Sequence, residues 1–226
     1  MAKVVVCSGV TWKDNPWVWA ISFERCERDE SRRHRPIIFS PAMVRAILDG
    51  RESQTRRVLS PQPLDMLAPW PSDSSCICFE DFISQVPYYV EAGYCPYGKP
   101  GDLLWVREAW STGKSLDPFT ASEIEAKYRD AGFVGDGPYC PLWYTSDGAY
   151  RRWGDNDIGD FGEPGRRRHA RFMPKWASRI WLRIVDIRCQ RLQDISEADA
   201  AAEGVRAMKD GSGVFVGREG PGALVT

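Results

Sequence analysis

Residues 50–57 combine three arginines with a carboxylate, two hydroxyls and an amide. Guanidinium groups suit bidentate contacts with phosphates, and short polar side chains can hydrogen-bond to the edge of a base. We therefore expect the arginines to hold phosphate and the shorter side chains to face a base. An ordinary polar exit from a helix is the alternative. The candidate contacts are Arg51, Glu52, Ser53, Thr55, Arg56 and Arg57.

The stretch from Lys99 to Glu108 places a charge on an apolar face. Its Pro-Gly pair predicts a tight turn, after which Leu103, Trp105 and Arg107 share one face of a strand. A charge on an apolar face has to be paired or to contact a ligand. A buried pair with a carboxylate and a contact with a ligand are equal alternatives for Arg107. The candidate contacts here are Lys99, Trp105 and Arg107.

Residues 166–171 form a dense basic run, which Phe172 and Trp176 follow closely. Basic side chains interleaved with aromatic rings suit single-stranded or flipped nucleotides, because every base has a face that can stack. We expect Trp105 or Trp176 to stack on a base, and a solvated charged face is the alternative. The candidate contacts in this part of the chain are Arg168, Trp176 and Arg179.

Neither a metal site nor a cofactor is expected. Cys76, Cys78, Cys95 and Cys140 lack the paired Cys-x-x-Cys spacing of structural zinc sites, and the chain has only 2 histidines. No glycine-rich phosphate loop follows a predicted strand, which argues against a nucleotide-cofactor fold.

Composition excludes several classes of protein. The chain has 226 residues, and its 43% hydrophobic content suffices for a packed core. It contains no run of about 18 apolar residues and no secretory signal, so we expect a cytoplasmic protein without a membrane span. The net charge of −1 conceals an excess of arginine in residues 1–57 and 151–191, which an excess of carboxylates in residues 58–150 and 192–226 offsets.

Short strands and short helices alternate along the chain. Ser40 and Pro41 predict the start of a helix that Gly50 ends, and capping boxes that begin at Thr120 and Ser196 predict two more helices. Apolar patterns predict strands over residues 16–23, 36–40, 102–108 and 179–189. In the last of these strands, we expect one face to carry Ile180, Leu182 and Ile184 and the other to carry Trp181, Arg183, Val185 and Ile187.

These elements predict a single α+β domain over residues 1–226, built as a mostly antiparallel β-barrel with short peripheral helices. Residues 1–25 would supply a tryptophan-rich N-terminal strand. Residues 111–173 would form a long inserted or binding loop, because most of this region has no sustained period. Residues 205–226 would form a glycine-rich tail.

Three stretches together resemble one family. They are RPIIFS…MVRAILDGRESQTRRV within residues 35–58, CPYGKPGDLLWVRE at residues 95–108, and PKWASRI…LQDISEADA…EGV within residues 174–205. In this order they resemble the ASCH-domain proteins of bacteriophages and prophages, part of the PUA-like superfamily. The resemblance implies a PUA-like barrel with a cleft for RNA or modified nucleotides. Characterised relatives include an acetylcytidine amidohydrolase and proposed ribonucleases.

The catalytic residues of the amidohydrolase branch are only partly matched. That branch uses a lysine and a threonine after the helix glycine, and a glutamate on a later strand. The threonine corresponds to Thr55, but Glu52 stands at the lysine position and Arg183 near the glutamate position. A carboxylate cannot supply the charge of lysine, and arginine cannot act as a carboxylate base, so the same catalytic set is not present.

The N-terminal segment 11–24 looks like the strand that usually closes these phage proteins at their C-terminus. We therefore hypothesise that the chain is circularly permuted, with an unrelated tryptophan-rich strand as the alternative. Termini of compact domains often lie close together, which makes permutation physically accessible. The hypothesis predicts that residues 16–24 pair with the strand at 179–189.

Three functions remain open. The leading hypothesis is the binding of RNA or a modified nucleotide in a basic cleft. The first alternative is a hydrolase acting on modified cytidine or RNA, which would use Thr55 and Glu52 and also Glu108. The second is a phage-encoded inhibitor that binds a host protein through the acidic residues 58–150. A phage-encoded protein would act in the cytoplasm of its bacterial host.

Overall fold

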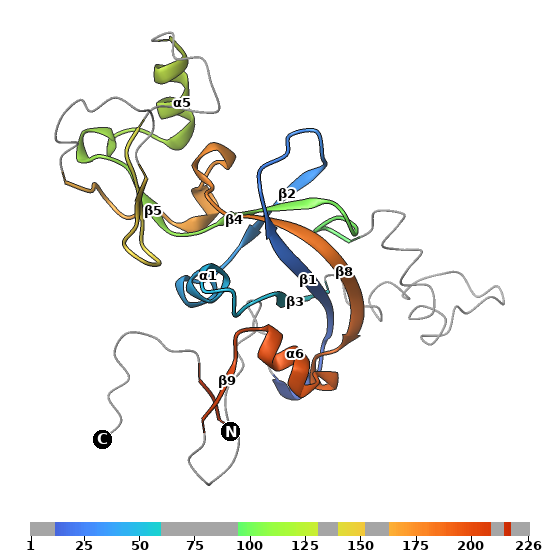
Figure 1. Ribbon diagram of the computed structural model, residues 1–226. Helices are drawn as coiled ribbons and strands as arrows, with labels where there is room; N and C mark the ends of the chain where they lie inside the picture. Colours follow the sequence, from blue (N-terminus) through green and yellow to red (C-terminus); the bar gives the residue numbers. More distant parts are fainter. Residues whose placement is uncertain (1–11, 60–94, 131–139, 152–162, 209–214, 218–226) are drawn as a thin grey trace, which may run out of the picture.

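The computed structural model describes residues 12–59, 95–130, 140–151, 163–208 and 215–217, and its main layer is a curved five-stranded sheet (Figure 1). In spatial order, the strands of this main sheet are β2 (His34–Ile38), β4 (Leu103–Arg107), β8 (Trp181–Arg191), β1 (Trp17–Cys26) and β3 (Gln54–Val58). The described helices are α1 (Pro41–Leu48), α5 (Ala121–Asp130) and α6 (Glu197–Ala202). None of these helices is long and apolar enough to cross a membrane.

Strand pairing in the main sheet is mixed. Strands β2 and β4 are parallel, whereas the β4–β8, β8–β1 and β1–β3 pairs are antiparallel. This order leaves β2 and β3 at the two edges, so the described strands do not close into a barrel. The expected α+β class and the mostly antiparallel pairing are therefore confirmed at this coarser level.

The N-terminal strand β1 lies inside the sheet rather than at an edge. It pairs with β8 from Trp17 opposite Arg191 to Cys26 opposite Trp181, and with β3 on its other side. This is the pairing that the permutation hypothesis predicts for residues 16–24.

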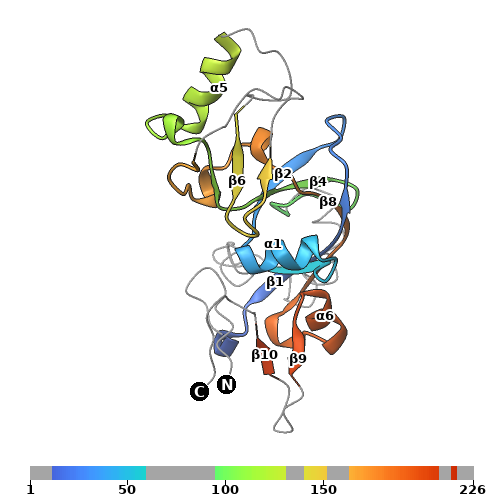
Figure 2. The ribbon, with the colours of Figure 1, turned by 60° about the vertical axis from the view of Figure 1, so that its left-hand side comes forward.

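Helix α1 covers one face of the main sheet (Figure 2). Its Val44 and Ile47 pack into one core cluster with the alternating apolar side chains of β1. Burial of each such aliphatic side chain contributes about 1.5–3 kcal/mol. The expected ends of the helix are confirmed: the Ser40 hydroxyl accepts a hydrogen bond from the Met43 N–H, and Gly50 has a φ of +71°.

The prediction that Ile187 lies on the face of β8 opposite Leu182 and Ile184 is wrong. Ile187 is buried in the same core cluster as Leu182 and Ile184. The register between β1 and β8 shifts between Ser22 and Phe23, which leaves Val185 without a residue opposite it. Such a bulge adds one residue to a strand, and every side chain beyond it then points to the other face.

A second hydrophobic lobe stands beside the main sheet, and most of it comes from residues 111–173, the region expected to be a loop. It contains helix α5 and a three-stranded sheet of β5 (Trp110–Ser111), β6 (Leu142–Tyr144) and β7 (Tyr150–Arg151). Its buried core consists of Trp110, Ile124, Cys140, Leu142, Tyr144, Met173, Trp176 and Ala177. The described part of 111–173 is therefore packed structure. Strands of two or three residues are too short to produce a periodic pattern.

The last helix, α6, lies at the other end of the molecule from the second lobe in both views (Figures 1 and 2). Its expected capping box is confirmed, because Ser196 accepts a hydrogen bond from the Asp199 N–H and Asp199 accepts one from the Ser196 N–H. Asp199 also binds Arg56 of β3 and Arg188 of β8. Part of the expected glycine-rich tail forms a two-stranded sheet of β9 (Arg206–Met208) and β10 (Phe215–Gly217).

The turn before β4 depends on a glycine. Gly98 has a φ of +112°, and a Cβ atom there would lie 2.6 Å from Asp102 Oδ2, which accepts a hydrogen bond from the Lys99 N–H. Gly98→Ala is expected to lower the free energy of unfolding by about 1–3 kcal/mol, because it adds a clash to a strained backbone.

Urea unfolding measures this loss, and Gly50→Ala is the matched control. Gly50 also has a positive φ, but a Cβ atom there would have no atom within 4 Å. We expect the control to cost about 1 kcal/mol. Equal losses in the two variants would contradict the importance of the Asp102 contact.

Candidate nucleic-acid interface

Arginine side chains lie over aromatic rings along the outer face of β4 and β8. Trp105 and Trp181 are paired residues of these strands and pack together. The guanidinium of Arg107 lies 4.5 Å from the ring centre of Trp105, and that of Arg28 lies 5.7 Å from the ring centre of Trp181. At the far end, Arg107 Nη1 donates to the carbonyl of Arg171. We call the set Arg28, Trp181, Trp105, Arg107, Arg171 and Phe172 the arginine–aromatic row.

Arg107 is half-buried and has no acidic partner among the described residues. Its Nε is buried without a hydrogen-bond acceptor, and its only polar contact within the described ranges is the Arg171 carbonyl, at 3.2 Å. Burial lowers the pKa of Arg107. Of the two alternatives for Arg107, the carboxylate pair is therefore absent from the described structure, and the positive charge is left uncompensated there.

Neighbouring arginines on the same side of the sheet do have acidic partners. Arg28 binds Glu30 at 2.5 Å, and Arg183 binds Glu24. Arg171 resembles Arg107 instead, because no carboxylate of the described residues forms an ion pair with it. The excess positive charge of the row therefore lies at the end formed by Arg107 and Arg171.

Phe172 is the exposed ring of the row. It belongs to the 3-10 helix Ala170–Phe172 and remains 60% exposed, with the Arg171 guanidinium 5.0 Å from its ring centre. An exposed aromatic face beside guanidinium groups is the arrangement that stacks an unpaired base next to its phosphate. In the sequence, Phe172 directly follows the basic run, but Trp105 or Trp176 was the ring expected to stack on a base.

Those tryptophans have buried roles. Trp105 and Trp176 are each only 6% exposed. Arg107 covers the ring of Trp105, and the ring of Trp176 packs edge-to-face with Trp110 in the second lobe, 5.9 Å between centres. In this structure neither ring offers a free face to a base.

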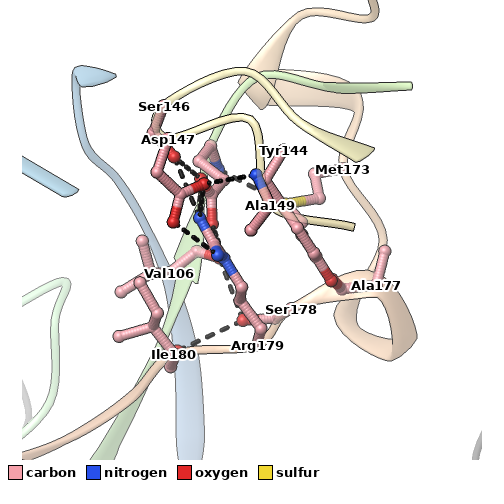
Figure 3. A network of polar contacts seen from close by, with 11 residues as sticks. Val106, Tyr144, Ser146, Asp147, Ala149, Met173, Ala177, Ser178, Arg179 and Ile180 are labelled. Atoms are coloured by element: carbon pink, nitrogen blue, oxygen red, sulfur yellow. Dashed lines mark hydrogen bonds and ion pairs between the residues drawn. The ribbon is translucent and has the colours of Figure 1, made fainter. Parts of the chain in front are cut away.

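Arg179 lies at the centre of a buried polar network (Figure 3). Its Nε and Nη2 donate to the two carboxylate oxygens of Glu108 at 2.8 and 3.0 Å, and its Nη1 donates to Asp147 at 2.9 Å. The hydroxyl of Ser146 accepts from Arg179 and donates to Glu108. The Glu108 side chain is only 2% exposed, so its charge depends on these partners.

The network fixes the second lobe to the main sheet. Glu108 follows β4, Arg179 precedes β8, and Asp147 lies in the turn between β6 and β7. Burial alone lowers the pKa of Arg179, but the hydrogen bonds that it donates to Glu108 and Asp147 outweigh burial and raise the pKa above its ordinary value. Arg179, a candidate nucleotide contact, thus binds two carboxylates. Arg45 of α1, which the sequence did not single out, adds a hydrogen bond to the Ser146 carbonyl at 2.6 Å.

Residues 50–57 do not converge on one surface. The side chain of Arg56 points to the face of the main sheet away from the core, where the guanidinium is covered by Asp199 and Glu203 and binds both of them. Thr55 is buried opposite Ile21 of β1. Arg51 pairs with Asp49, and Ser53 is exposed.

Arg57 spans the gap between the two edges of the main sheet. It belongs to edge strand β3, but its Nη2 donates to the carbonyl of Ile38, the last residue of edge strand β2, at 2.7 Å. Its guanidinium also lies 4.9 Å from the ring centre of Phe39. A side chain therefore links the two strands that a closed barrel would join through their backbones.

The remaining basic candidates are separate from each other. Lys99 is exposed in the turn before β4. Arg168 is buried, and it donates to the carbonyls of Leu116 and Phe119 in the second lobe. The geometry of Arg168 indicates a structural role.

The three catalytic candidates lie in different surroundings. Glu52, Thr55 and Glu108 are all buried. A Cβ atom at Gly204 would lie 3.6 Å from Glu52 Oε2, which places Glu52 beside the end of α6. Glu108 is instead held by Arg179 and Ser146 at the junction with the second lobe.

Within the described ranges, no group of three or more His, Cys, Asp or Glu side chains could hold a metal ion. Cys76 and Cys78 lie outside these ranges. Cys95 and Cys140 are both buried, and burial raises the pKa of Cys140 to about 12, which disfavours the thiolate that a metal would need.

The chain matches no protein-family model, no curated protein and no solved structure.

Proposed function

We propose that this protein binds single-stranded RNA, or an unpaired modified nucleotide, on the arginine–aromatic row. In this proposal Arg107 and Arg171 contact phosphate, and Phe172 stacks on a base. Such stacking tolerates many sequences, because it uses the face of a base rather than its edge.

One observation carries the proposal, namely the charge of Arg107, which no carboxylate of the described residues compensates. A partly buried charge without a partner destabilises a fold, so its persistence is explained most simply by a ligand of opposite charge. A phosphate suits the site, because a guanidinium can bind two of its oxygens at once.

We also infer that the main sheet is an opened form of the PUA-like barrel that the resemblance to ASCH-domain proteins implies. The hydrogen bond from Arg57 to Ile38 supports this inference, because it brings the two edge strands within reach of each other. The pairing of β1 with β8 supports the hypothesis of circular permutation.

Fluorescence anisotropy with a labelled single-stranded oligoribonucleotide of about ten nucleotides tests the proposal. We expect binding that weakens steeply as salt is added, because phosphate contacts release counterions. A double-stranded RNA of the same sequence should bind more weakly, since its bases are already stacked. The absence of single-stranded binding at low salt would overturn the proposal.

Phe172→Ala is expected to weaken single-stranded RNA binding by about 1–3 kcal/mol, the usual contribution of one stacked base. Because the ring is 60% exposed, the free energy of unfolding should change little. Tyr150→Ala is the control, since Tyr150 is also exposed but belongs to β7, outside the row. Unchanged affinity in Phe172→Ala would contradict the stacking role.

A further inference from the structure

One of the two histidines lies beside the arginine–aromatic row. His34 is the first residue of β2, and its ring packs edge-on against Trp181, with 5.8 Å between ring centres. Both ring nitrogens have a polar neighbour: Nδ1 lies 3.1 Å from the carbonyl oxygen of Arg32, and Nε2 lies 3.2 Å from Lys175 Nζ.

These two neighbours determine where the imidazole carries its proton. A carbonyl oxygen can only accept a hydrogen bond, so Nδ1 must carry a hydrogen. A lysine ammonium can only donate, so Nε2 must present its lone pair to Lys175. His34 is therefore neutral in this arrangement, with its single ring proton on Nδ1.

Several charged side chains lie close to His34. Lys175 also donates to Glu30 at 2.8 Å, and Glu30 accepts from Arg28 at 2.5 Å. Hydrogen bonds from Lys175 and Arg28 lower the pKa of Glu30 to about 2, so Glu30 remains ionised wherever histidines titrate.

Further charges nearby are paired with each other. Arg32 binds Asp29 at 3.2 Å, and hydrogen bonds from Ser31 lower the pKa of Asp29. On β8, Arg183 binds Glu24. A proton on His34 Nε2 would therefore add a positive charge directly beside the Lys175 ammonium.

We propose that protonation of His34 strengthens binding of single-stranded RNA to the arginine–aromatic row. A proton on Nε2 removes the acceptor that holds Lys175 and places a second cation against its ammonium. Lys175 then turns away from the ring, and the face beside Trp181 gains one positive charge. The inference rests on the proposed function, and it makes the affinity for RNA rise as the pH falls.

Nuclear magnetic resonance of the imidazole nitrogens tests the arrangement without any RNA. The chain has only 2 histidines, so both rings can be assigned, and exposed His169 serves as the internal control. We expect the His34 ring at neutral pH to carry its proton on Nδ1, and Lys175→Met to remove that strong preference. A His34 ring with its proton on Nε2 in the wild type would overturn the inference.

A second experiment measures the affinity for single-stranded RNA at about pH 7.5 and about pH 5.5. The wild type is expected to bind about threefold to tenfold more tightly at the lower pH, with a salt dependence steeper by about 0.7, the value for one more phosphate contact on a single strand. His34→Gln should bind like the wild type at the higher pH and lose this gain, whereas His169→Gln should keep it.

The outcomes separate the two proposals. RNA binding without a gain at low pH, or a gain that persists in His34→Gln, would overturn the role of His34 alone. No RNA binding at either pH would overturn the proposed function and this inference with it.

Discussion

Glu108→Gln is expected to lower the free energy of unfolding by about 3 kcal/mol, because it removes one partner of a buried ion pair. Glutamine retains the size of the side chain and one acceptor oxygen, but it cannot balance the charge of Arg179. Asp147 remains bound to Arg179, which limits the loss. Urea unfolding followed by tryptophan fluorescence measures the change.

Glu24→Gln is the matched control for Glu108→Gln. It makes the same chemical change on another arginine partner, but the Glu24–Arg183 pair is exposed, so the expected loss is about 0–1 kcal/mol. Equal losses in the two variants would contradict the structural role of the buried network. A double-mutant cycle with Arg179→Met should give a coupling energy between Glu108 and Arg179 well above that between Glu24 and Arg183.

Arg107→Gln is expected to weaken single-stranded RNA binding by about 1–3 kcal/mol, or roughly fivefold to 150-fold. The same change should leave the free energy of unfolding within about 1 kcal/mol of the wild type. The variant leaves no acidic group unpaired among the described residues. Removal of a half-buried charge that no described carboxylate compensates stabilises the fold, and this gain offsets the weaker packing on Trp105 and the missing hydrogen bond to Arg171.

Arg183→Gln is the control for Arg107→Gln. Arg183 is an exposed arginine on β8, already paired with Glu24, so its loss should change RNA affinity by no more than about twofold. Anisotropy and urea unfolding on the same protein preparations give both quantities. A large loss of stability in Arg107→Gln would indicate a structural role and would contradict the ligand role.

The parts of the fold that the sequence predicts are those set by local chemistry. The start and end of α1 follow from Ser40, Pro41 and Gly50, and the start of α6 follows from the capping box at Ser196. Period-two alternation gives the faces of β1 and β4, because each strand is long enough to repeat the pattern. The bulge at Val185 interrupts that alternation in β8, and nothing in the local pattern marks it.

Long-range pairing accounts for what the sequence could not predict. Glu108 and Arg179 stand 71 residues apart, and no spacing rule connects them. The sequence posed two equal alternatives for Arg107, because the absence of a carboxylate partner within the described ranges becomes visible only once the chain is folded. The same holds for stacking: the large rings of Trp105 and Trp176 fill cores, and the smaller ring of Phe172 reaches the surface.

The most direct test of the central claim is the salt dependence of single-stranded RNA binding by the wild type and by Arg107→Gln. Each phosphate contact on a single strand contributes about 0.7 to the slope of log affinity against log salt concentration. If Arg107 binds phosphate, the slope of the variant will be smaller by about this amount. Equal slopes, or no binding by the wild type at low salt, would contradict the claim.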